Sequence, residues 1–133
     1  MRAYFQFFLL LIGSLCAGLP MGCAPKSSQR PAYRIVLSQC GAGGGWRQAL
    51  LDGMNRGLIF HPEVQFRVVS SGDKGPEKQL AQIRALRPGE IDLLIVTPCG
   101  TNNITVAPAV QEIYDRGVPV VVLDQRVKTS RYS

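Results

Sequence analysis

The chain has 133 residues, with 15 basic and nine acidic side chains and a formal net charge of +6 at pH 7. This length suits about one domain. The basic residues are spread along the chain rather than clustered in a stripe, which argues against a nucleic-acid interface, and we expect no nucleic-acid partner.

The first 24 residues differ from the rest of the chain. They read MRAYFQFFLLLIGSLCAGLPMGCA, with Arg2 as the only charge, and the apolar part is short for a membrane span. This pattern is typical of a secretory signal. Cleavage after Ala24 is one route, and cleavage before Cys23, which would leave a cysteine for lipidation, is another; an uncleaved anchor is a third. We therefore expect an exported, periplasmic protein, with or without a membrane anchor.

A polar linker, 25–33, leads into a domain at 34–133 in which apolar runs alternate with amphipathic segments. Nearly continuous apolar runs suit parallel strands that are covered on both faces. The segments expected as strands are 34–38, 64–70, 91–97 and 118–124, and those expected as helices are 46–60, 76–86 and 106–114. This order with right-handed crossovers predicts an α/β fold with an open, doubly wound parallel sheet. Because the sequence stops soon after the fourth strand, without a following helix, we expect a piece of something longer.

Ligands of such a sheet bind at the carboxyl ends of its strands. Four segments are expected to meet there, and any site should be built from them: 38–46, 70–75, 97–103 and 124–126.

The glycine-rich segment before Trp46 does not fit a phosphate site. The third glycine of a dinucleotide fingerprint starting at Gly41 would fall on Trp46, and Asp73 follows Gly41 by 32 residues instead of about 20. A P-loop would also need a lysine here. Trp46 therefore either stacks on the apolar face of a sugar ring or packs against the sheet, and its position at the start of a helix leaves both readings open.

Catalytic chemistry is not expected from these residues. Nucleophilic or glycosidic catalysis needs a base beside a nucleophile or two facing carboxylates. The only histidine, His61, is expected at the opposite end of the sheet, and only Asp73 could accompany Asp124. We expect no enzyme activity and no cofactor.

Four stretches together resemble the N-terminal lobe of the type I periplasmic sugar-binding proteins, the ribose-binding and lactose-repressor-like family: SQCGAGGGWRQALLDGM, EVQFRVVSSGDKGPEKQLAQIRAL, EIDLLIVTP and YDRGVPVVVLDQR. They are particularly similar to sensor regions of Bacteroidetes-type hybrid two-component regulators. The resemblance covers about residues 33–128 and implies the strand order 2-1-3-4. It also implies sugar binding for a carbohydrate ABC transport system or, as the alternative, periplasmic sugar sensing, with a membrane permease or a sensor kinase as partner.

The resemblance also implies roles for individual residues. It places an aromatic stacking residue at Trp46, a polar contact at Asp73, and an Asp-Arg pair after the fourth strand. Asp124 matches the first member of that pair, whereas Gln125 stands at the arginine position and Arg126 follows it. The family clamps its ligand between two lobes, so we expect weak or no affinity from this single lobe.

Cys40 and Cys99 follow the first and third strands, which are neighbours in the implied order. A disulfide can form if their Cα atoms lie within about 7 Å, and two separate thiols are the open alternative. A metal site is disfavoured because His61 is expected at the other end of the sheet.

Overall fold

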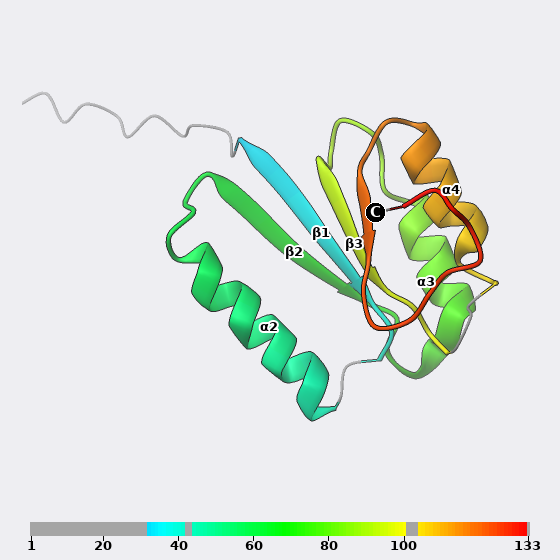
Figure 1. The fold of residues 1–133 in the computed structure, drawn as a ribbon, viewed down its shortest axis with the longest axis horizontal. Coiled ribbons are helices and arrows are strands. Elements are labelled where there is room, and N and C mark those ends of the chain that lie inside the picture. Colours follow the sequence, from blue (N-terminus) through cyan, green and yellow to red (C-terminus); the bar gives the residue numbers. More distant parts are fainter. Residues whose placement is uncertain (1–31, 42–43, 101–103, 133) are drawn as a thin grey trace, which may run out of the picture.

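The computed structural model describes residues 32–41, 44–100 and 104–132, which form a parallel sheet with helices on both faces (Figure 1). In chain order the elements are β1 (Tyr33–Gln39), α2 (Gly45–Leu58), β2 (Val64–Ser70), the short 3-10 helix η1 (Gly72–Lys74), α3 (Gly75–Arg84), β3 (Leu93–Thr97), α4 (Ala107–Asp115) and β4 (Val120–Val122). The four strands lie in the order β2-β1-β3-β4, and every pair is parallel. The expected open, doubly wound α/β sheet and its strand order are confirmed.

Some element ends differ from the expected ones. The fourth strand was expected over 118–124, but only Val120–Val122 form β4. Proline lacks an N–H for the ladder, so Pro119 contributes only its carbonyl, which accepts from the Leu94 N–H at 3.0 Å. On the other side Asp124 has a φ of 73°, a left-handed conformation that ends the extended backbone.

The hydrophobic core lies between the sheet and the pair α3 and α4. Fully buried members come from β3, from both helices and from the N-cap of α4, and they include Leu94, Val96, Ile83, Val106, Val110 and Ile113. These residues repeat at the helical period in α4 and at alternate positions in β3, as a helix and a strand that share one apolar layer require.

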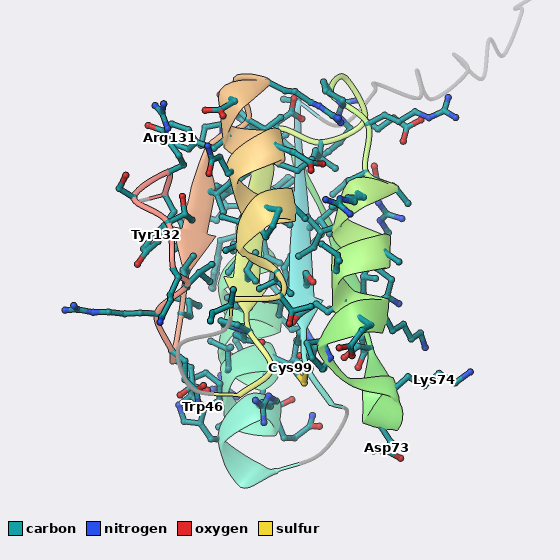
Figure 2. All side chains as sticks on the ribbon, turned by 90° about the vertical axis from the view of Figure 1, so that its right-hand side faces the viewer. Trp46, Asp73, Lys74, Cys99, Arg131 and Tyr132 are labelled. Carbon is teal, nitrogen blue, oxygen red and sulfur yellow. A yellow bond between two sulfur atoms is a disulfide. The ribbon has the colours of Figure 1, made fainter. Side chains whose placement is uncertain are left out.

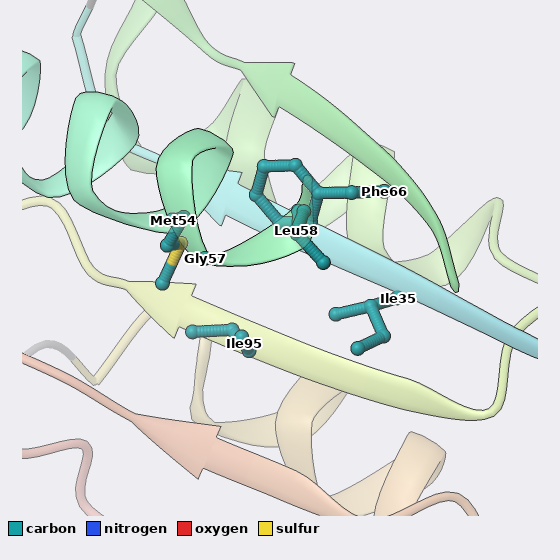
Figure 3. A pocket seen from close by; sticks show the side chains of 6 residues that line it. All are labelled: Ile35, Met54, Gly57, Leu58, Phe66 and Ile95. Carbon is teal, nitrogen blue, oxygen red and sulfur yellow. The ribbon is translucent and has the colours of Figure 1, made fainter. Parts of the chain in front are cut away.

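The other face of the sheet carries α2, which has no buried residue. A groove of about 220 Å³ separates this helix from the strands, and all its lining is apolar (Figure 3). The lining comes from α2 and three strands: Ile35, Met54, Gly57, Leu58, Phe66 and Ile95. The continuous apolar runs predicted strands that are covered on both faces. On the face of α2 this coverage is only partial.

The signal segment, Cys23 and nearly all of the linker lie outside the described residues. Within the part of the chain that the structure describes, no helix is long and apolar enough to cross a membrane.

Candidate functional site

The loops at the carboxyl edge of the sheet are joined by direct contacts. The Ser70 hydroxyl donates to the Gly41 carbonyl at 2.9 Å, which links the loops after β2 and β1. The Cys40 N–H donates to the Thr97 carbonyl at 3.1 Å, which links the loop after β1 to the end of β3. The first three of the four expected segments therefore meet, although residues 101–103 of the third lie outside the described residues.

A disulfide between Cys40 and Cys99 joins the same two loops in the structure. Their Cα atoms are 4.9 Å apart, and 59 positions separate them in the sequence. The Ser71 hydroxyl lies 3.6 Å from the Cys99 sulfur, so the loop after β2 contacts the bridge as well. The disulfide is therefore at the centre of the carboxyl edge.

Trp46 is the second residue of α2, and it is not a buried core residue, because 51 % of its surface is exposed. The guanidinium carbon of Arg47 is 6.0 Å from the centre of its ring. An exposed indole next to a charged hydrogen-bond donor offers one apolar face and one polar edge to a ligand. The structure therefore leaves the Trp46 ring accessible for the stacking role that the resemblance implies.

Arg47 brings the fourth segment to the first, because a guanidinium nitrogen lies 3.8 Å from a carboxylate oxygen of Asp124. Both side chains are partly exposed, and the Arg47 Nε is buried without a hydrogen-bond partner. Arg47 was not predicted as a site residue from the sequence. The two partners are 77 positions apart in the sequence, and the only available signal was that Arg47 follows Trp46 at the start of a helix.

Gln125 and Arg126 line a small pocket of about 110 Å³ beside Asp124, together with Val122 and Tyr132. The Gln125 Oε1 is buried and has no hydrogen-bond partner, whereas Arg126 is exposed. Tyr132 was not predicted as a site residue either, and it reaches this pocket because the segment after β4 folds back against the core. The pocket thus combines a carboxylate, an amide, a guanidinium and an aromatic ring, groups that suit the hydroxyls and the apolar face of a polyol.

Asp73 lies apart from the other candidate residues. It is an exposed member of η1, just before α3. Figure 2 shows Asp73 and Trp46 along the same edge of the molecule but on opposite sides of Cys99. The structure therefore joins Asp124 to Arg47, whose guanidinium also lies near the Trp46 ring, whereas no described contact joins Asp73 to Trp46.

His61 lies in the connection from α2 to β2, at the opposite end of the sheet from Trp46. Its Nδ1 is 3.0 Å from a carboxylate oxygen of Glu63. The pKa of the Glu63 carboxyl is lowered, first by a hydrogen bond from its own backbone N–H and second by this contact with His61. No three potential metal ligands among His, Cys, Asp and Glu gather within the described ranges.

Solved structures share the fold of this chain. The chain is 28% identical to the fructose-binding periplasmic domain of a hybrid two-component system, with a TM-score of 0.66 over 75% of this chain and 32% of that one. A solute-binding protein of an ABC transporter from Thermobispora bispora is 27% identical, with a TM-score of 0.63 over 75% and 32% of the two chains. The chain folds as one lobe of a type I periplasmic sugar-binding protein.

A third solved structure shares the fold. The periplasmic ribose ABC transporter protein from Conexibacter woesei is 21% identical, with a TM-score of 0.66 over 77% of this chain and 33% of that one. No family model and no curated protein matches the chain. The chain spans about a third of the length of the solved sugar-binding proteins that it matches.

Proposed function

We propose that this chain is the sugar-binding lobe of an exported, non-catalytic binding protein that serves a carbohydrate ABC transport system. The observation that supports the proposal best is the half-exposed Trp46 ring beside the Arg47–Asp124 pair at the carboxyl edge of the sheet. The ligand is a monosaccharide, and binding needs no cofactor. The mature lobe works in the periplasm, where a lipid on Cys23 would tether it to a membrane.

The chemistry of this edge suits a sugar. The apolar face of a pyranose or furanose ring stacks on an indole, and its hydroxyls exchange hydrogen bonds with charged and amide groups. Asp124 supplies acceptors, Arg126 supplies donors, and the buried Gln125 Oε1 lacks a donor that a hydroxyl would provide. Two of the similar structures carry fructose or ribose in their names, which favours the same ligand class.

A second function is periplasmic sugar sensing in a hybrid two-component signalling protein. The similarity to the fructose-binding domain of such a system, at 28% identity, favours it. The partner of the lobe would then be a sensor kinase instead of a membrane permease. Both functions use the same ligand site, and the partner decides between them.

A single lobe is expected to bind weakly. Ligand pockets usually bury about 70–90% of a small molecule, whereas the edge of one lobe contacts it from one side only. We therefore expect dissociation constants in the millimolar range for the isolated chain, with one sugar preferred over its epimers.

Calorimetric titration of the protein without its signal against a panel of pentoses and hexoses tests the proposal. Asp124→Asn should weaken the preferred sugar about tenfold, because it removes the carboxylate from the site. Asp52→Asn is the matched control, since Asp52 is an exposed carboxylate of α2 whose side chain contacts Gln48. Absence of binding by every sugar at high millimolar concentration would contradict the function, and micromolar binding by the monomer would contradict the expected weakness.

A further inference from the structure

We infer that Gln79 and the Cys40–Cys99 disulfide are positioning elements for Trp46, because they hold Gly41, five residues before it, against the end of the sheet. This inference rests on the proposed sugar site and concerns how its aromatic contact is held.

Gln79 projects from α3 to the carboxyl ends of two strands and is fully buried. Its amide nitrogen donates to the Ser38 hydroxyl at 3.2 Å and to the Thr97 carbonyl at 3.1 Å, with the Ser38 carbonyl at 3.4 Å. Its amide oxygen accepts from the Cys99 N–H at 3.2 Å. The Gln79 side chain thus joins three segments: the end of β1, the end of β3, and the turn after β3 that carries Cys99.

The disulfide passes this restraint to the loop after β1. Cys99, held by Gln79, is bonded to Cys40, and the next residue, Gly41, accepts hydrogen bonds from the Ser70 hydroxyl and the Gln39 amide at 2.9 and 3.3 Å. Trp46 follows Gly41 by five residues. Gly41 is therefore held by contacts from three directions, whereas α2 itself contributes no buried residue that packing could hold.

This network is separable from the main core. Gln79 and both cysteines lie outside the hydrophobic cluster formed by α3, α4 and the strands. The β1–β3 ladder also pairs over five residues without them. Because a ligand contact must be held in place before binding to contribute affinity, loss of the network should act on Trp46 and on binding.

Trp46 is the only tryptophan, so its fluorescence reports on this loop alone. The test compares the oxidised wild type with three altered forms: the wild type reduced by dithiothreitol, the double variant Cys40→Ser/Cys99→Ser, and Gln79→Leu, which keeps the volume and removes the hydrogen bonds. The measurements are the time-resolved fluorescence anisotropy of Trp46 and the sugar affinity, both at a temperature where each form is folded by circular dichroism.

The matched control is Ile113→Val, a core change in α4 that lowers stability without touching the network. We expect a larger fast component of anisotropy decay and at least a threefold loss of sugar affinity in all three altered forms, and wild-type values in Ile113→Val. If Gln79→Leu does not fold, reduction of the wild type still tests the inference.

Wild-type anisotropy in both the reduced protein and Gln79→Leu would overturn the inference, as would two free thiols in the native protein by thiol counting. A wild type that binds no sugar would contradict the proposed function alone, because the anisotropy comparison needs no ligand.

Discussion

The two faces of the sheet carry similar apolar side chains but are covered very differently. On the face of α3 and α4, alternate strand residues such as Leu94 and Val96 are fully buried. On the face of α2, Ile95 remains partly exposed, and an apolar groove lies between the helix and the strands. The same strands therefore form a packed core on one side and an incomplete layer on the other.

Because of this difference, packing against the sheet contributes little to holding Trp46 and Arg47 in place. Trp46 and Arg47 begin the helix on the loosely packed face, so burial cannot fix them. Their position depends on particular contacts at the carboxyl edge, among them the Arg47–Asp124 pair and the disulfide. The buried core is concentrated on one face, whereas Trp46 and Arg47 begin the helix on the other.

The comparison predicts unequal costs for two neighbouring residues of β3. Leu94→Ala should lower the free energy of unfolding by about 2–5 kcal/mol, because Leu94 is fully buried and its truncation leaves a cavity. Ile95→Ala should cost about 1–2 kcal/mol, because Ile95 lines an open groove. Urea unfolding of both variants provides the measurement. Equal losses would show that α2 packs against the sheet as tightly as α3 and α4 do.

A smaller effect of opposite sign is expected within α2. Gly57→Ala should raise the free energy of unfolding by about 0.5–1 kcal/mol, because alanine is the better helix former. A Cβ at Gly57 would meet no atom within 4 Å, so the added methyl fits. Thermal unfolding measures the gain, and Gly53→Ala, with equally free space, is the parallel variant. Destabilisation by both would mean that the helix lies closer to the sheet than the groove indicates.

Much of this fold was predictable because its signals are local. The apolar runs marked the four strands, and the Pro76 and Gly117 positions marked helix ends that the structure retains. The apolar spacing of α2 showed that the helix has an apolar face, but spacing does not say how closely another layer covers it. Partial coverage was therefore not predictable from the pattern.

The candidate site was less predictable because its contacts are distant in sequence. Fold topology alone places Trp46, Asp73 and Asp124 at one edge of the sheet, yet Asp73 lies across the disulfide from Trp46. The Arg47–Asp124 pair joins residues from opposite ends of the domain, and no periodic pattern specifies such a pair. Loop conformation decides which side chains of one edge become neighbours.

The smallest predicted effect comes from a contact that belongs to neither face. Asp92 accepts two hydrogen bonds from the Arg34 guanidinium, both at 2.9 Å, and one from the Arg34 N–H at 2.7 Å. The side-chain bond first, and then the backbone bond, lowers the pKa of Asp92 below its ordinary value of 3.8. A folded-state pKa below the unfolded one stabilises the fold above the unfolded pKa, and this contribution disappears as the pH falls through the folded pKa.

The stability difference between wild type and Asp92→Asn should accordingly be constant near neutral pH and shrink below about pH 4. Urea unfolding at several pH values measures it, and the effect should be small because the pair is partly exposed. A difference that stays constant down to pH 2 would show that the pair adds no charge-dependent stability. Because the pair joins β1 to the start of β3 at the end opposite the candidate site, its loss should leave the contrast between Leu94→Ala and Ile95→Ala unchanged.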